Sequence, residues 1–328
     1  LGLSQTNYVR ALATVAANCS SAAAALSAHQ SIGVPQPLIL FGTEEQKKKY
    51  LPRLAKGDLS AFALTEPEVG SDPARMSTTA TPDGDHWILN GTKLWCTNGA
   101  VARVLVVMAQ TPPKIVNGKE KKQITAFIVD TDAPGFEVVH RCQFMGLRGI
   151  QNGLLKFNKV RVPKENILWG EGKGLRLALV TLNAGRLSLP ATCVGGTKKI
   201  LSYVRDWSVN RVQWGSPIGK HESVATKVAS TAANLHAMES MLWLACHWVD
   251  KKTHDIRLEA AMAKVFCSVR SHEIVDQAIQ IRGGRGYENA VSLRQREEEP
   301  WPVERMYRDS RINQIVEGTT EILSLFIA

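Results

Sequence analysis

The sequence contains no uninterrupted apolar run that approaches the length of a bilayer-spanning helix. It also lacks the basic n-region and apolar core of a secretory signal peptide, since it opens "LGLSQTNYVRAL". These absences argue against an integral membrane protein and against a secreted one. The chain has no starting Met and ends inside the apolar run "EILSLFIA", so we expect both ends to be trimmed.

Clustered metal or disulfide ligands are absent as well. The six cysteines are widely spaced and include no CxxC pair. The stretch "HEIVD" (272–276) places Asp276 where an HExxH motif needs its second histidine. The sequence therefore predicts no metal site, no disulfide framework and a reducing compartment.

The net charge of +10 is not gathered into a basic tail or stripe. Lysine and arginine exceed aspartate and glutamate by 3, 3 and 4 over residues 1–60, 61–170 and 171–328. An even excess argues weakly for anionic small molecules and against nucleic acid as the partner. The chain also has no internal repeat and no low-complexity tract.

What is present is an ordinary globular composition, 44% hydrophobic and 21% charged, in 328 residues, enough for two or more packed units. Small helix-forming residues dominate 5–30. A second helix is predicted over "GTEEQKKKYLPRLAKG" (42–57), with Thr43 as its N-cap and acids in its first turn.

Between about 61 and 168 the pattern changes to short β-rich runs separated by turn signals such as Asn90-Gly91. The stretch "TPPKIVNGKEKKQ" (111–123) is interpreted as a solvated loop between two strands. We expect a compact antiparallel β domain here.

Helical periodicity returns at Gly174. Four segments joined by short connections predict an antiparallel four-helix bundle, and they cover 174–210, 220–252, 256–282 and 302–316. The fold class is therefore α+β and multi-domain, with predicted divisions at 1–60, 61–170 and 171–328.

Three glycine-containing motifs invite a ligand-binding interpretation. "GEGKGLRLAL" (170–179) has GxGxG spacing and no surrounding βαβ unit, so a turn entering a helix is favoured over a dinucleotide site. "RVQWGSPIG" (211–219) and "QIRGGRGY" (280–287) are typical of helix ends. They would also let a flat ring or a pyrophosphate approach the backbone, and both alternatives stay open.

"FALTEPEVGSD" (62–72) combines a turn rich in backbone N–H groups with the hydroxyls of Thr65 and Ser71. Such a turn can bind a phosphate or a flavin edge. The alternative is an ordinary loop leading into the β domain, and the spacing alone favours that loop.

Glu317, in "INQIVEGTTEIL" (312–323), is the strongest chemical candidate. Gly318 can end the preceding helix and Thr319 or Thr320 can cap the next one. An acid at a helix C-terminus is disfavoured by roughly 0.3–1 kcal/mol, so stability alone explains Glu317 poorly. Apolar neighbours would raise its pKa, which suits a general base near neutral pH; a purely structural role is the alternative.

These motifs together resemble the acyl-CoA dehydrogenase family, in the family's order and across nearly the whole chain. The stretches that carry the resemblance are "GTEEQKKKYLPRLAKG", "AFALTEPEVGSD", "LNGTKLWCTNG", "VRVPKENILW", "RVQWGSPI", "QIRGGRGY" and "PVERMYRDSRINQIVEGT". "AQTPPKIVNGKEKKQITAFIVD" and "VTLNAGRLSLPA" are similar to the branch that acts on long and very long acyl chains.

The resemblance implies N-terminal helices, a central β domain and a C-terminal four-helix bundle, with bound FAD, in a homodimer or homotetramer. It implies α,β-dehydrogenation of an acyl-CoA to the trans-2-enoyl-CoA, with flavin N5 as hydride acceptor and electron-transferring flavoprotein as the electron acceptor. A bacterial cytoplasm or a mitochondrial matrix is the expected location, and membrane association stays open. The acyl chain is expected to be of medium to long length.

The resemblance also assigns roles to individual residues, with Glu317 as the catalytic base. Its flavin-binding residues are Phe62, Leu64, Thr65, Gly70, Ser71, Trp95, Cys96, Thr97, Arg211, Gln213, Trp214, Gln280, Gly283, Gly284, Thr319 and Glu321. Its substrate-binding residues are Ser71, Asn183, Arg186 and Gly318.

Some branches of the family carry the base on the helix near Arg186, where this sequence has Gly185. Departures from the family pattern are Trp214 for Phe, Cys96 for an aliphatic or hydroxyl residue, and a long stretch at 288–301. The alternatives to a dehydrogenase are an acyl-CoA oxidase that uses O₂, and a non-catalytic flavoprotein scaffold or nucleic-acid binder on the same fold.

Overall fold

The computed structural model describes residues 2–253 and 255–328. Its contacts divide the chain into two compact units. The helical unit comprises Leu1–Ala24, Phe144–Arg148 and Arg186–Ala328, and the sheet unit comprises Ala25–Gln143 and Gly149–Gly185. The three-part division at 1–60, 61–170 and 171–328 stays a prediction.

Helices form where the sequence predicts them, over 5–30 and 42–57, and an additional helix, α3, lies between these two stretches. Helices α1 (Gln5–Asn18) and α2 (Ser20–Ser27) are followed by a short π-helical turn, then by α3 (Pro35–Phe41) and α4 (Glu44–Ala55). Thr43 caps α4 through a capping box, in which its hydroxyl accepts from the Gln46 amide and the Gln46 side chain accepts from the Thr43 amide. The predicted N-cap is confirmed.

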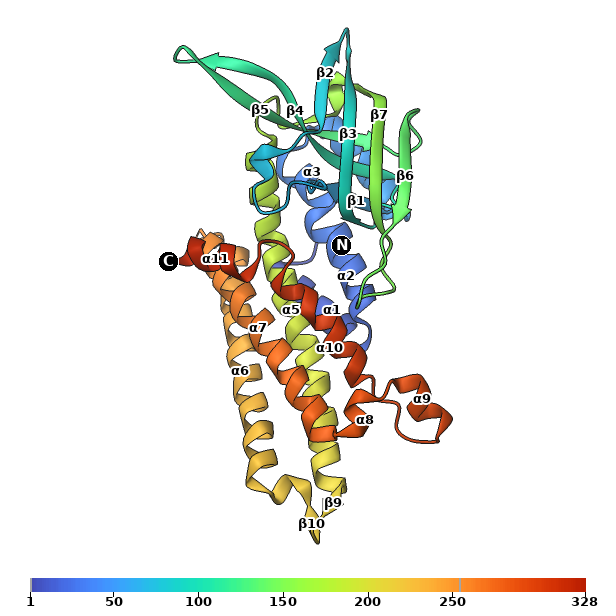
Figure 1. The fold of residues 1–328 in the computed structure, drawn as a ribbon. Helices are drawn as coiled ribbons and strands as arrows, with labels where there is room; N and C mark the ends of the chain where they lie inside the picture. The colour runs from blue at the N-terminus through green and yellow to red at the C-terminus, as the bar shows by residue number, and fades with distance from the viewer. Residues whose placement is uncertain (1, 254) are drawn as a thin grey trace. The chain divides into compact units, whose positions relative to one another are not determined.

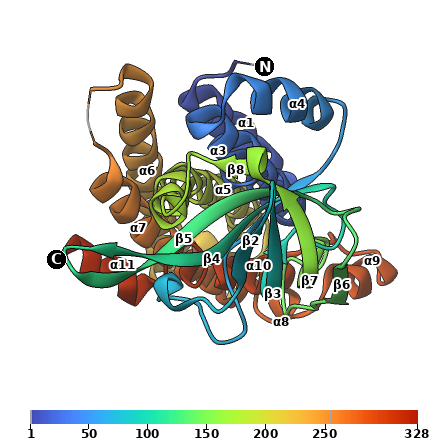
Figure 2. The same ribbon diagram turned by 90° about the horizontal axis from the view of Figure 1, so that it is seen from above.

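The sheet unit is built on one twisted sheet with the strand order β6-β7-β3-β2-β4-β5-β8, and β1 pairs with β4 (Figure 2). The strands are β1 (Ser60–Ala63), β2 (Thr79–Asp83), β3 (His86–Thr97), β4 (Val104–Val116), β5 (Lys119–Asp130), β6 (Phe136–Arg141), β7 (Asn152–Pro163) and β8 (Ile167–Leu168).

Two expectations for this region need correction. The sheet is mixed, because β1 runs parallel to β4 and β2 contacts β4 in parallel at Thr79 and Gln110. The predicted solvated loop at 111–123 is instead the outer part of a long β4–β5 hairpin, which projects beyond the other strands (Figure 1). Backbone pairing resumes at Lys114 and Lys121 after an irregularity at the two prolines, so polar side chains did not exclude strand structure.

Strand β4 explains how one sheet supports two cores. Its side chains alternate, with Leu105 and Val107 in one buried cluster and Val106 and Met108 in the other. Leu38 of α3 and other helical side chains complete the second cluster. A strand buried on both faces needs apolar residues at consecutive positions, which is the pattern of "VLVVMA".

The helical unit contains α1, the part of α5 (Gly174–Asn210) that follows residue 185, α6 (Glu222–Lys251), α7 (Arg257–Arg282) and α10 (Val303–Arg311). Helices α5, α6, α7 and α10 run alternately up and down in Figure 1, as predicted for an antiparallel bundle. Shorter helices α8 (Gly284–Tyr287), α9 (Ala290–Gln295) and α11 (Thr320–Ile327) complete the unit. Helix α7 contacts α6, α10 and α11.

The predicted helix at 302–316 is shorter than expected. Helix α10 ends at Arg311, a 3₁₀ turn follows at Ile312–Gln314, and the amides of Ile315 and Val316 both bond to the Ile312 carbonyl. The last turn tightens before the chain reverses. Glu317 therefore lies in a turn of its own between α10 and α11.

The sequence predicts no apolar run long enough to span a bilayer, and helix α5 corrects that expectation. Among the described residues it is long and apolar enough, by length and composition, to cross a membrane. Of its qualifying window, 65% is buried inside the protein, which is typical of a core helix. Length and composition therefore give only weak support for a membrane span.

Candidate active site

Glu317 stands out by its backbone. Its φ is 57° and that of the next residue, Gly318, is 94°, so two consecutive residues lie in the left-handed region. This region suits Gly but costs a side-chain-bearing residue on the order of 1–3 kcal/mol. Non-glycine residues held in this way are concentrated at functional sites.

The environment of the Glu317 carboxyl group combines burial with the charges of two cationic side chains. The side chain is partly buried, and its Oε2 atom is shielded from solvent with no hydrogen-bond partner among the described residues. Burial raises the pKa of Glu317 to about 7, although the charges of Lys264 and Arg186 oppose the rise. A carboxyl group with that pKa exchanges a proton near neutral pH, as a general base must.

The segment after Glu317 is fixed by α11. Thr319 is the N-cap of this helix, and its hydroxyl accepts a hydrogen bond from the Ile322 amide at 3.3 Å. A Cβ on Gly318 would lie 3.0 Å from the Leu323 side chain and in a positive-φ conformation. The positive φ therefore favours glycine at this position, and a larger residue would also require the Leu323 side chain to move.

Lys264 of α7 lies behind the same turn. It is fully buried, and its Nζ atom donates to the carbonyl oxygen of Gly318 at 2.6 Å. Burial lowers the pKa of Lys264 to about 8, with Glu317 opposing the change. Sequence reasoning missed this residue, although a lone lysine inside "AAMAKVFCSV" was an available signal of a buried charge.

In the sheet unit, the candidate flavin residues gather around the end of β1 and the end of β3. The Thr65 carbonyl accepts from the Leu94 amide at 2.9 Å, and the Cys96 thiol lies 3.5 Å from the Phe62 carbonyl. These contacts join "FALT" (62–65) to "LWCT" (94–97). The two motifs, 30 residues apart in the chain, therefore form one surface.

Trp95 is the exposed feature of that surface. The β3–β7 register shifts between Lys93 and Cys96, and Trp95 has φ 54° within this bulge. The bulge turns the indole outward, leaving it 57% exposed, while Cys96 points into the core. An aromatic side chain held outward by a strained backbone offers a flat apolar contact for a ring.

A buried ion pair underlies this surface. Lys93 donates to Glu66 Oε1 at 2.8 Å, and their side chains are 0% and 1% exposed. Glu66 also accepts from the amides of Ser77 and Thr78, at 2.5 and 3.0 Å. Although burial by itself would raise it, these partners lower the pKa of Glu66 to about 2. The pair fastens the "TEPEVGSD" loop to β3.

The remaining candidates lie at the ends of bundle helices. Trp214 and Gly215 both have positive φ in the tight turn between β9 (Val212–Gln213) and β10 (Ser216–Pro217), and Trp214 is 90% exposed. Gly283 ends α7 with φ 61° and ψ −138°, a conformation open essentially only to glycine. Sequence analysis therefore placed both turns correctly.

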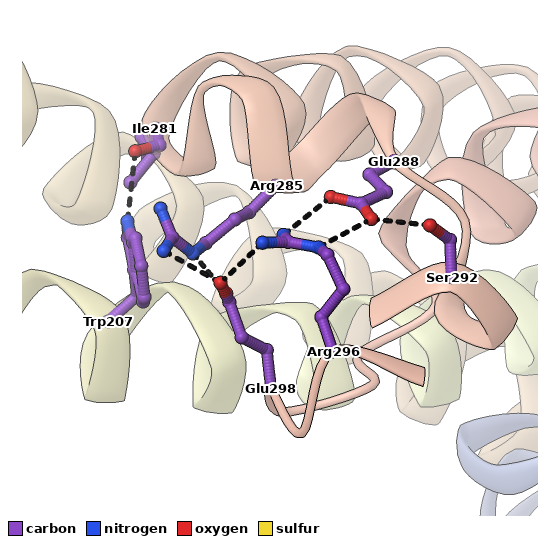
Figure 3. A network of polar contacts seen from close by, with 7 residues as sticks. All are labelled: Trp207, Ile281, Arg285, Glu288, Ser292, Arg296 and Glu298. Atoms are coloured by element: carbon purple, nitrogen blue, oxygen red, sulfur yellow. Dashed lines mark hydrogen bonds and ion pairs between the residues drawn. The ribbon is translucent and has the colours of Figure 1, made fainter. Parts of the chain in front are cut away.

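Figure 3 shows how the stretch that carries Glu288, Ser292, Arg296 and Glu298 folds back beside Arg285. Arg285 bonds to Glu298, and Arg296 bridges Glu298 and Glu288 at 3.1 and 2.8 Å. Ser292 adds a bond to Glu288. The departure from the family pattern is thus an ordered, ion-paired segment.

The candidate residues fall into two groups, each within one unit. Those in the sheet unit are Phe62, Leu64, Thr65, Gly70, Ser71, Trp95, Cys96, Thr97 and Asn183. Those in the helical unit are Arg186, Arg211, Gln213, Trp214, Gln280, Gly283, Gly284, Glu317, Gly318, Thr319 and Glu321. Across the described residues, no group of three or more His, Cys, Asp or Glu side chains could hold a metal ion. The six cysteines are free thiols.

Profiles of the acyl-CoA dehydrogenase N-terminal, middle and C-terminal domains match residues 1–58, 61–160 and 172–328. The chain is 53% identical over 330 residues to the probable acyl-CoA dehydrogenase FadE10 of Mycobacterium tuberculosis (strain ATCC 25618 / H37Rv), covering 100% of this chain and 50% of the relative. It is 38% identical over 332 residues to the mitochondrial very long-chain specific acyl-CoA dehydrogenase of Homo sapiens, covering 100% and 49%.

Among solved structures, an acyl-CoA dehydrogenase of Bacillus anthracis complexed with FAD superposes with a TM-score of 0.87 at 35% identity, covering 100% of this chain and 56% of that one. The chain spans about half the length of the curated relatives it matches.

Proposed function

The chain belongs to the acyl-CoA dehydrogenase family, and on that premise we propose that it catalyses the FAD-dependent α,β-dehydrogenation of a fatty acyl-CoA to the trans-2-enoyl-CoA. Glu317 is the base that removes the α-proton. The observation that carries the proposal is the Glu317 carboxyl group, with its shielded Oε2 atom and a backbone conformation that costs energy. The raised pKa, about 7, supports the same role.

The chemistry requires a base of this kind. The α-proton of a thioester is only weakly acidic, so a carboxylate must be held beside it and must not be weakened by hydration. Glu317 meets this need, since shielding from water raises its pKa and the rigid turn fixes its direction. The Glu317 backbone N–H is proposed to polarise the thioester carbonyl.

The residues of the sheet unit fit a flavin. Trp95 offers an exposed flat ring and follows Leu94, whose amide bonds to the Thr65 carbonyl. A Cβ on Gly70 would meet no atom within 4 Å, so the loop leaves open space there. When bound, FAD supplies the two-electron oxidant that takes a hydride from the substrate β-carbon. We assign flavin contacts to Phe62, Leu64, Thr65, Gly70, Ser71, Trp95, Cys96 and Thr97.

The helical unit supplies the second set of proposed contacts. Arg211, Gln213, Trp214, Gln280, Gly283 and Gly284 are assigned to the FAD of a neighbouring subunit, and Thr319 and Glu321 to its adenosine half. Open space at the Cβ positions of Gly283 and Gly284 supports a close approach of the pyrophosphate to the backbone. Ser71, Asn183, Arg186 and Gly318 are assigned to the acyl-CoA.

The proposal extends to partners and location. The electron acceptor is electron-transferring flavoprotein, the assembly is a homodimer or homotetramer, and the compartment is a bacterial cytoplasm or a mitochondrial matrix. Free cysteines are compatible with either reducing compartment. An acyl-CoA series of increasing length, scored by flavin bleaching, identifies the preferred chain, for which we propose a medium to long acyl group.

The central test is Glu317→Gln. Glutamine keeps the shape but cannot accept the α-proton, so the variant is expected to retain bound yellow flavin and to lose bleaching by acyl-CoA by about 10²–10⁴-fold. The measurement is anaerobic stopped-flow absorbance of the flavin, with wild-type protein as the control. Full bleaching in the variant would assign the base to another residue, and a wild-type protein without any flavin spectrum would overturn the cofactor.

The same apparatus separates a dehydrogenase from an oxidase. After anaerobic reduction by acyl-CoA, air is admitted and peroxide is measured. Slow reoxidation is expected of a dehydrogenase, whereas rapid peroxide formation would identify an acyl-CoA oxidase.

A further inference from the structure

Lys264 is a buried cation that packing does not explain. It lies on α7 between Ala263 and Val265 and is 0% exposed. Removing an ammonium group from water is costly, and an apolar side chain of the same volume is often the more stable choice. A lysine kept in such a place calls for a specific partner.

That partner is the turn that carries Glu317. The Nζ atom of Lys264 donates to the Gly318 carbonyl at 2.6 Å, a short charge-assisted bond. On the other side of the turn, Thr319 caps α11. The left-handed pair Glu317 and Gly318 is therefore held between two anchors, and Lys264 is the only one of them that carries charge.

We propose that Lys264 is a positioning residue for Glu317: by holding the Gly318 carbonyl it fixes the left-handed turn, and its positive charge, placed at the residue next to Glu317, favours the carboxylate form. The inference rests on the proposed function for the role of Glu317 as base. Lys264 itself bonds to the backbone and need not touch substrate or cofactor.

The charged groups around Lys264 and Glu317 determine the direction in which Lys264 changes the pKa of Glu317. The charged and titratable groups that face Lys264 are Glu317 and Glu321, which favour its ammonium form, Arg186, which disfavours it, and Cys193. Burial raises the pKa of the Cys193 thiol to about 11, so it is neutral near pH 7. Glu317 faces Lys264 and Arg186, and both favour its carboxylate form. Without Lys264, Glu317 should therefore hold its proton to higher pH.

The test compares Lys264→Met with Lys227→Met. Methionine keeps the length and removes the charge and the donor. Lys227 is a matched control, because its Nζ atom also bonds to a backbone carbonyl, that of Ser223 at 3.3 Å on α6, but at an exposed site. Lys264→Arg is the conservative variant that keeps the cation.

The first measurement follows the protonated carboxyl band of Glu317 by infrared difference spectroscopy, with Glu317→Gln as the blank, between about pH 5 and about pH 10. In Lys264→Met the titration is expected to move upward by about one pH unit. The second measurement is the rate of flavin reduction by acyl-CoA across the same range. Its acid limb should move in the same direction, with about tenfold slower reduction at the acid end.

The outcomes are distinct. An upward shift in Lys264→Met, none in Lys227→Met and a near-normal titration in Lys264→Arg support the inference. An unchanged Glu317 titration in folded Lys264→Met overturns it, even if the protein melts earlier, because a merely structural lysine would lower stability without moving the carboxyl titration. If the methionine variant does not fold, Lys264→Gln, which keeps a donor without charge, is expected to give the same upward shift.

The infrared titration does not depend on catalysis. A shifted Glu317 titration together with bleaching that survives Glu317→Gln would remove the proposed function and leave the positioning role of Lys264 intact. An unshifted titration with bleaching lost in Glu317→Gln would do the reverse.

Discussion

Two candidate site residues, Glu317 and Trp95, have a backbone with positive φ although they are not glycine. Each position costs on the order of 1–3 kcal/mol, which other parts of the structure must offset. In Trp95 the strain turns an apolar ring toward solvent, and in Glu317 it directs a carboxyl group. Such residues are explained better by what they contact during function than by stability.

At the same residue scale, Glu317→Gln should stabilise the protein above neutral pH. Burial raises the pKa of this acid from its ordinary value of 4.5 to about 7. Between those values the folded state binds a proton that the unfolded state has lost, so unfolding free energy falls as pH rises through the window. Above about pH 7 the wild-type protein carries the full cost of a buried carboxylate, which glutamine avoids. We therefore expect the unfolding free energy of Glu317→Gln to exceed that of the wild type by about 1–3 kcal/mol at pH 8.

Urea unfolding of both proteins at pH 8 and at pH 4.5 measures this difference. At the lower pH the gain should largely vanish, because the wild-type carboxyl is then protonated in the folded state. An equal gain at both pH values would mean that shape, rather than charge, distinguishes the two side chains.

At the scale of elements, β3 and the loop after β1 act as one piece through Lys93 and Glu66. Their side chains are almost fully buried, and Glu66 gains further bonds from the amides of Ser77 and Thr78. Lys93 lies two residues before Trp95, at the point where the register of β3 shifts. The loop "TEPEVGSD" and the bulge therefore share one anchor.

Lys93→Met is expected to destabilise the protein by about 3–5 kcal/mol, because it leaves the Glu66 carboxylate buried without its cation. Thermal or urea unfolding measures the loss. Lys156→Met, on the exposed face of β7, is the control and should change stability by less than about 0.5 kcal/mol. A loss in Lys93→Met as small as that of the control would show that the pair contributes nothing.

The same pair gives an acid dependence with a definite sign. Its partners hold the pKa of Glu66 at about 2, below its ordinary value of 4.5. The stability that they contribute is present above pH 4.5 and is lost as pH falls from 4.5 toward 2. In Lys93→Met this loss should become smaller, since the charge that lowers the pKa is gone, and unfolding measured at pH 3 and pH 6 tests it.

At the scale of the whole molecule, the candidate residues are distributed over both units. The exposed Trp95 and its loop belong to the sheet unit, whereas Glu317, Gly283 and Gly284 belong to the helical unit. Neither unit contains the full set.

Adding FAD to flavin-free protein is expected to raise the unfolding free energy by about 2.7 kcal/mol at a free concentration one hundred times Kd. The melting temperature should rise by a few degrees accordingly. Differential scanning fluorimetry against FAD concentration measures this, and FMN, which lacks the adenosine half assigned to Thr319 and Glu321, is the control. Equal shifts with FMN and FAD would remove that assignment, and no shift with either would contradict flavin binding.

Much of the fold follows from local chemistry. The capping box at Thr43, the long apolar helices and the glycine that ends α7 each depend on residues close in sequence, and all were predictable. The β4–β5 hairpin was not, because a lysine-rich strand is held by its partner across the hairpin and not by its own pattern. The parallel pairing of β1 with β4 likewise depends on residues far apart in the chain.

The candidate site divides in the same way. The sequence by itself determined the kind of residue at each position, the order of the motifs and the glycines that the turns require. Only the tertiary structure decided that Lys264, 53 residues before Glu317, lies behind its turn, and that Lys93 meets Glu66. Burial of a charge and the direction of a strained side chain depend on contacts between distant segments, and a linear sequence does not contain those distances.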